Sequence, residues 1–168
     1  MDNTKKWSDF MELANTKVRL GQKIDKYKAN IQIGFYPSFD NHSLLQLQLD
    51  EEKLIWHRTT WRKLVDAPKF NDPIQKLKHI GHQLTPSIEY QHGSTDINQV
   101  TEIIEFIKKL SLKPRLETSG GIILDGCEYE LAIGVESTVT TYKWHYLPEE
   151  WTDLQNLADM LDNLNRSL

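Results

Sequence analysis

The stretch that decides the fold covers residues 120–164 and reads GGIILDGCEYELAIGVESTVTTYKWHYLPEEWTDLQNLADMLDNL. Within it, Asp125-Gly126 separates two apolar runs, and Asp-Gly is a strong hairpin signal because both residues tolerate positive φ. After this turn apolar and polar residues alternate, which is typical of a strand with one apolar and one polar face. The stretch therefore predicts three antiparallel strands, at Ile122–Leu124, Cys127–Ile133 and Thr138–Tyr146.

The spacing of the apolar residues changes at Pro148. Proline suits the first turn of a helix, and Glu149 and Glu150 favour the positive end of the helix dipole. Apolar residues then recur every three or four positions, at Trp151, Leu154, Leu157, Ala158, Leu161 and Leu164. This pattern predicts an amphipathic helix over 148–165 that covers the apolar face of the strands.

Composition indicates a single domain over residues 1–168. The chain holds 39% hydrophobic and 26% charged residues, close to the values of ordinary soluble domains. It has no apolar run long enough for a membrane span, and its N-terminus is not followed by a signal-peptide core. Its one cysteine cannot form an internal disulfide, which is typical of a reducing compartment. We therefore expect a cytoplasmic protein.

Charge is distributed unevenly along the chain. Residues 1–30 carry seven Lys/Arg and four Asp/Glu, whereas residues 117–168 carry two Lys/Arg and ten Asp/Glu. Because acidic residues dilute the basic ones, we expect no nucleic-acid partner. The acidic half is explained either by solubility or by a surface that is complementary to a basic partner.

The rest of the chain divides into three further segments. Residues 1–28 predict a helical segment whose apolar stripe is Trp7, Phe10, Met11, Ala14 and Val18. Residues 30–61 predict a first meander of three strands. Residues 72–112 predict a pair of helices, the first opened by Asp72 and Pro73, and Ser87–Gly93 between them is a loop or a short edge strand. Val65–Asn71 is expected to be a loop.

These segments predict an α+β fold. We expect two three-stranded antiparallel meanders, at 30–61 and 120–146, which form one sheet or two related layers, with the helices packed on one face. An antiparallel sheet can leave its other face in water. By strand alternation that face carries Gln32, Gln46, Gln48, Glu128, Glu130, Lys143 and His145.

Candidate catalytic and metal-binding residues form no convincing set. Cys127 lies on the apolar side of its strand and is expected to be an inert, buried thiol. His79 and His82 lack the further ligands of a zinc site, unless His57, His92 and His145 join them in space. Glu128 and Glu130 share a strand face, which is more typical of solubility than of glycoside hydrolysis. Hence no catalytic residue, metal or cofactor is predicted.

Most of the tryptophans suit core packing, with Trp61 the favoured exception because it ends its strand near Arg58 and Arg62.

The C-terminal residues also carry a resemblance. An Asp-Gly-x-x-Tyr-Glu-Leu strand at 125–131, an aromatic strand, and a Pro-x-x-Trp helix start at 148–151 resemble the C-terminal end of small bacterial α+β proteins with a domain of unknown function. Some proteins of that kind are immunity or accessory proteins. The resemblance covers about the last 45 residues and implies a protein-binding role without assigning any functional residue.

Together these observations favour a non-enzymatic, protein-binding protein of a bacterial cytosol, with an immunity-type inhibitor as the concrete version. The expected binding residues lie on the polar sheet face: Glu128, Glu130, Glu136, Lys143, His145, Gln46 and Gln48. One alternative is an enzyme or small-molecule binder with a site between sheet and helices, lined by Tyr142, Trp144, His57 and His145. Another is a subunit that assembles only with itself.

Overall fold

The computed structural model describes residues 3–24, 28–50, 52–78, 84–111, 126–135, 138–145 and 151–168. Its elements in chain order are α1 (Asn3–Leu20), β1 (Ala29–Pro37), β2 (His42–Leu49), β3 (Lys53–Trp61), α2 (Lys63–Asn71), α3 (Pro73–Lys78), β4 (Ile88–Asp96), the 3₁₀-helix η1 (Ile97–Val100), α4 (Thr101–Lys109), β5 (Cys127–Val135), β6 (Thr138–Trp144) and α5 (Thr152–Ser167). The strand expected at Ile122–Leu124 and the helix start expected at 148–150 lie outside the described residues.

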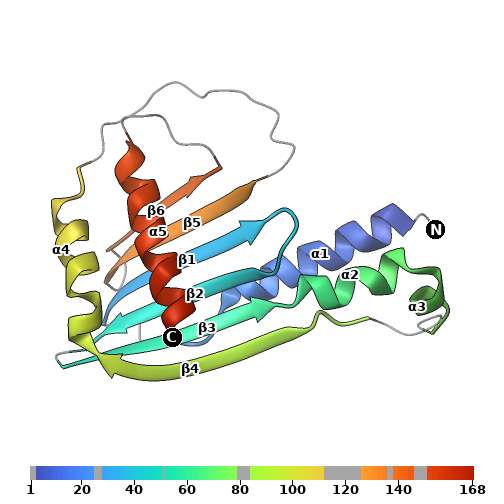
Figure 1. Ribbon diagram of the computed structural model, residues 1–168, viewed down its shortest axis with the longest axis horizontal. Helices are drawn as coiled ribbons and strands as arrows, with labels where there is room; N and C mark the ends of the chain where they lie inside the picture. The colour runs from blue at the N-terminus through green and yellow to red at the C-terminus, as the bar shows by residue number, and fades with distance from the viewer. Residues whose placement is uncertain are drawn as a thin grey trace.

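The six strands form one antiparallel sheet in the order β4-β3-β2-β1-β5-β6 (Figure 1). Strand β1 joins the two runs of strands, because it pairs with β2 on one side and with β5 on the other. Ile31, for example, lies opposite Leu47 in β2 and opposite Ile133 in β5. The predicted α+β class with an antiparallel sheet is confirmed, in the version in which both runs belong to a single sheet.

One face of the sheet carries the large core, which α4 and α5 cover (Figure 1). Its strand residues follow the predicted alternation, and α5 adds every third or fourth residue, as its apolar stripe predicts. The apolar stripes of α4 and α5 both pack against this face of the sheet. The fully buried or nearly fully buried members are Ile31, Ile33, Leu45, Leu47, Leu54, Val100, Leu131, Leu154, Leu157, Ala158 and Leu161.

The opposite face carries the small core, which α1 covers. It consists of Phe10, Ala14 and Val18 from α1 with Tyr36, Leu44 and Trp61 from the strands. Leu44 and Leu45 are neighbours in β2, so they point to opposite faces and belong to different cores. The expectation that the helices share one face is therefore not confirmed, since α1 lies on the other side of the sheet from α5 (Figure 1).

Two segments differ from the sequence-based expectation. Helix α2 covers the whole of Val65–Asn71, which was expected to be a loop, and it includes Pro68. Proline removes one helical hydrogen bond and usually ends a helix, which is why sequence reasoning placed a loop there. Strand β4 is a full edge strand of nine residues where a loop or a short strand was expected between two helices.

Candidate functional site

The sheet register brings the predicted polar residues together on one face. Gln46 lies opposite Gln32, and Glu130 lies opposite Lys143, while Tyr36 lies opposite Glu128. This is also the face on which α1 packs, so it is not an open surface along its whole length. Gln46 and Gln48 are 3% and 5% exposed. Of the predicted binding residues, only Glu136 lies outside the described part of the chain.

The two carboxylates of β5 are linked to α1 by Arg19. Its Nη2 lies 2.7 Å from Glu128 Oε1, and its Nε lies 3.2 Å from Glu130 Oε2. Two side chains from β6 and the residue after it complete the arrangement, because Lys143 Nζ lies 3.0 Å from Glu130 Oε1 and His145 Nε2 lies 3.4 Å from Glu128 Oε2. The arrangement, here called the Arg19 network, compensates the negative charge that the sequence places on this strand. Arg19 was not among the predicted site residues, and the sequence carries no signal that α1 crosses this face.

The ring of Tyr36 packs against the guanidinium of Arg19. The guanidinium of Arg19 lies 4.7 Å from the centre of the Tyr36 ring, a cation–π distance. The ring lies so close to Gly34 that a Cβ on that residue would come within 2.5 Å of it. Burial raises the pKa of Tyr36 far above its ordinary value, so the phenol stays neutral.

A second group of polar side chains is buried beside the small core. His42 is 4% exposed, and its Nδ1 lies 2.6 Å from Asn15 Oδ1 of α1. Its Nε2 lies 3.2 Å from Nζ of Lys63, a lysine of α2 that also donates to the carbonyl of Ser38 at 2.6 Å. A neutral ring that donates to Asn15 through Nδ1 can accept from the ammonium through Nε2. Burial and the charge of Lys63 lower the pKa of His42 to about 4, and burial lowers the pKa of Lys63.

Asp66 of α2 is the most completely buried charged residue in this region, with 0% exposure. Its carboxylate accepts hydrogen bonds from Trp61 Nε1 (2.8 Å), from the amide and hydroxyl of Ser87 (2.8 and 2.7 Å) and from Lys69 Nζ (2.5 Å). Although burial opposes ionisation, these four donors outweigh it and lower the pKa of Asp66. Trp61 is fully buried in this cluster, so the sequence-based expectation that it is the exception to core packing is wrong.

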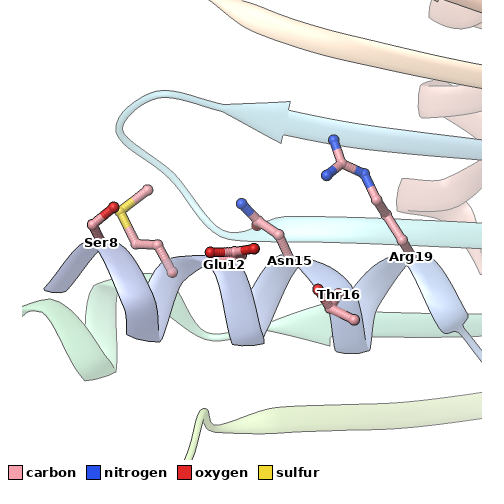
Figure 2. A pocket seen from close by; sticks show the side chains of 6 residues that line it. Ser8, Glu12, Asn15, Thr16 and Arg19 are labelled. Atoms are coloured by element: carbon pink, nitrogen blue, oxygen red, sulfur yellow. The ribbon is translucent and has the colours of Figure 1, made fainter. Parts of the chain in front are cut away.

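A groove of about 400 Å³ runs along one side of α1, between the Arg19 network and the buried group around His42. Its lining residues are Ser8, Met11, Glu12, Asn15, Thr16 and Arg19. Figure 2 shows Asn15 and Arg19 projecting from α1 on the side of the neighbouring strands. Because these two residues bond to His42 and to the β5 carboxylates, the groove wall is continuous with both polar groups.

Large apolar side chains are exposed on α2, on α3 and in the β1–β2 loop. Figure 1 shows α2 and α3 at one end of the molecule. Here the end surface means Phe39 of the β1–β2 loop, Leu64 and Val65 of α2, and Ile74 and Leu77 of α3, which are 45–76% exposed. The loop and α2 touch, since Asn41 Oδ1 accepts from the amide of Leu64. Ile74 and Leu77 of α3 therefore lie on the outside of the described structure.

The alternative pocket lined by Tyr142, Trp144, His57 and His145 does not form. Tyr142 and Trp144 pack on the large core, whereas His57 lies opposite Gln46 and His145 contacts Glu128 on the other face. The two histidines also lie four strand positions apart, or about 19 Å at normal strand spacing. These four side chains therefore cannot line one site.

The remaining chemical candidates are separate from one another. Cys127 is half-buried against the large core, and burial raises the pKa of its thiol, which disfavours the thiolate. In the described part of the chain, no three His, Cys, Asp or Glu side chains gather as a metal cluster. His79 and His82 lie outside that part.

Comparison with family models, with characterised proteins and with solved structures finds no significant match to this chain. No helix among the described residues combines the length and the apolar character needed to cross a membrane.

Proposed function

We propose that this protein is a non-enzymatic protein-binding protein and that its partner docks on the end surface. The observation that carries the proposal is the exposure of five large apolar side chains, Phe39, Leu64, Val65, Ile74 and Leu77, on adjoining short elements. Apolar side chains that gather on the outside of a domain mark interaction surfaces more often than scattered ones do. Complete burial of one such side chain against a partner would contribute about 1.5–3 kcal/mol of hydrophobic free energy to binding.

The buried polar groups behind the end surface support this proposal. Lys63 and Asp66 face inward from α2 and are held by Ser38, Trp61 and Ser87. Their bonds fix the rotation of the helix, so that Leu64 and Val65 are presented outward in one orientation. A surface that is ordered before binding loses less conformational entropy when the partner docks.

The concrete version of the proposal is an immunity-type inhibitor of a bacterial cytosol, which acts by covering a toxin. Such a protein needs a rigid recognition surface and no reactive group. Residues 125–151 resemble the C-terminal end of small bacterial α+β proteins, some of which are immunity or accessory proteins, and this resemblance supports this version. The Arg19 network is its second contact region, where Glu128, Glu130, Lys143 and His145 offer charges of both signs to the partner.

Affinity capture of the tagged protein from its native cells, at low and then at high salt, tests the proposal. Docking through apolar side chains predicts that the partner stays bound at high salt, because salt weakens charge pairs and not apolar contacts. The double variant Leu64→Ser/Ile74→Ser should lose the partner. The matched control Leu20→Ser, on an equally exposed leucine of α1, should keep it.

Two results would count against the end surface. Equal capture by the double variant and by wild type would exclude it as the docking site. Release of the partner by salt, together with its loss in Glu128→Lys, would move the site to the Arg19 network. Circular dichroism of each variant separates a lost contact from a lost fold.

A second function, binding of a small polar molecule, is favoured by the groove along α1. Its volume suits a metabolite-sized ligand, and its lining combines a guanidinium, an amide and hydroxyl groups. A thermal-shift screen against Thr16→Trp, which places a large side chain into the groove, tests this function. A ligand that stabilises wild type and the variant equally does not occupy the groove.

A further inference from the structure

Two histidines face each other across the β3–β4 pair, on the same sheet face as the Arg19 network but towards the opposite edge of the sheet. His57 and His92 are direct partners in the antiparallel register. Their ring centres are 6.1 Å apart and their planes are inclined by 28°, so the rings are stacked side by side. His92 is exposed and His57 is half-buried, so the pair is reached from solvent.

Gln22, just after α1, orients the inner ring of the pair. Its amide nitrogen donates to the carbonyls of Arg58 and Gln91, at 3.2 and 2.9 Å, which bridges the two strands. With the nitrogen so placed, the amide oxygen of Gln22 lies 3.4 Å from His57 Nδ1 and can accept a hydrogen bond from it. A histidine held through Nδ1 presents the lone pair of Nε2 outward, which is how metal-binding histidines are usually oriented.

The charged side chain that follows His57 in β3 points away from the pair. The Arg58 guanidinium lies on the other face, where it bonds to Gln91 and to the carbonyl of Asn165. Among the described residues no acidic or cysteine cluster adjoins the pair. Donors of this kind suit zinc, nickel and copper rather than magnesium or calcium.

We propose that His57 and His92 form a two-histidine site for a divalent transition metal of the zinc, nickel and copper class. Directly opposed residues in an antiparallel pair have Cβ atoms about 4.5–5.5 Å apart, within reach of a shared ligand. Tetrahedral zinc with bonds of about 2.0–2.1 Å needs its two nitrogens about 3.3 Å apart. The proposed site requires the two rings to turn about their side-chain torsions until the Nε2 atoms reach that separation, with water completing the coordination. The bound metal links edge strand β4 to β3.

Calorimetric titration of the untagged full chain with NiCl₂ and with ZnCl₂ at neutral pH tests the site. Wild type should bind one metal ion, and the Hε1 NMR signals of His57 and His92 should shift together. His57→Asn and His92→Asn should each abolish this binding step. The matched control His145→Asn, which removes an exposed histidine from the Arg19 network, should leave it unchanged. Gln22→Ala should weaken binding roughly tenfold to a hundredfold, as expected when the group that orients a ligand is lost.

Two outcomes overturn the site. The first is the absence of metal-dependent heat and of any shift in the two Hε1 signals. The second is binding that persists in both His57→Asn and His92→Asn, which would show that other residues hold the metal. Circular dichroism of the variants shows whether they keep the fold, because both positions lie on the sheet surface where asparagine is tolerated.

Discussion

The large core and the small core are built from different chemistry. The large core is chiefly aliphatic, with leucine and isoleucine from four strands interlocked with the stripes of α4 and α5. The small core combines the rings of Phe10, Tyr36 and Trp61 with the buried polar side chains of His42, Lys63 and Asp66. The first depends on removing apolar area from water, and the second depends also on the hydrogen bonds that His42, Lys63 and Asp66 make.

This difference implies different sensitivities. A truncated leucine in the large core leaves a cavity whatever the solvent, so its cost should not vary with pH or salt. A buried polar group costs free energy as soon as a partner is lost or a proton is gained. The end surface and the α1 groove both rest on the small core. The regions proposed to bind therefore lie on the core whose stability should depend on pH.

The largest expected effect is in the large core. Leu131→Ala removes a fully buried side chain from the centre of β5 and should lower the free energy of unfolding by about 4 kcal/mol. Urea unfolding at pH 7 and at pH 5 measures the loss, which should be the same at both values. Leu13→Ala, on the exposed side of α1, is the control and should have little effect. A loss that changed with pH would contradict the distinction between the two cores.

Acid should act on the small core through His42. The unfolded chain binds a proton on this ring near its ordinary pKa of about 6.5, whereas the folded chain binds it only near 4. The stabilisation from the neutral ring is therefore complete above pH 6.5 and is lost as the pH falls towards 4. The free energy of unfolding should drop by about 3 kcal/mol over this interval. Protonation would place a second cation 3.2 Å from Lys63.

The variant His42→Gln isolates that contribution. Glutamine can bond to Asn15 and Lys63 but does not titrate, so its unfolding free energy should lack the drop between pH 6.5 and 4. The difference between the two pH profiles, obtained from urea unfolding, is the quantity to compare. Identical profiles for wild type and variant would show that His42 is not the group that responds.

Asp66→Asn should have a smaller effect in the same core. The amide keeps the size of the side chain but replaces one carboxylate oxygen by an NH₂ group. This group faces either Trp61 Nε1 and the Ser87 amide, which share Oδ2, or Lys69 Nζ and the Ser87 hydroxyl, which share Oδ1. We expect a loss of about 2 kcal/mol at pH 7, measured by thermal and urea unfolding. Asp162→Asn, an exposed carboxylate paired with Arg166 on α5, is the matched control. Equal stability of the two variants would mean that the carboxylate charge contributes nothing to the small core.

The same contrast explains how much the sequence could predict. The large core follows from periodicity alone, because alternation in the strands and the stripe of α5 depend only on which residues are apolar. The stripe of α1, from Trp7 to Val18, was also predicted, but periodicity cannot say which face of a sheet a helix covers. That choice depends on contacts between distant residues, such as Arg19 with Glu128.

The candidate site was predicted only in part. Strand alternation correctly placed Glu128, Glu130, Lys143 and His145 on one face. It could not show that these charges pair with one another and with α1. Helix α2 was missed because Pro68 and its polar residues suggest a loop, and with it the buried roles of Lys63 and Asp66. Only the three-residue spacing of Asp66 and Lys69, which form an ion pair, hinted at a helix there.

The smallest expected effect concerns the link between the two regions. Arg19 connects α1, which covers the small core, to β5, whose other face carries the large core. Because its side chain is 40% exposed, Arg19→Gln should cost less than about 1 kcal/mol, and the difference from wild type should shrink in about 1 M salt. Urea unfolding at low and high salt measures both quantities, with Arg166→Gln as a control for an exposed pair within one helix. A loss of about 3 kcal/mol that persists in salt would instead make Arg19 a structural member of the small core, held by packing on Tyr36.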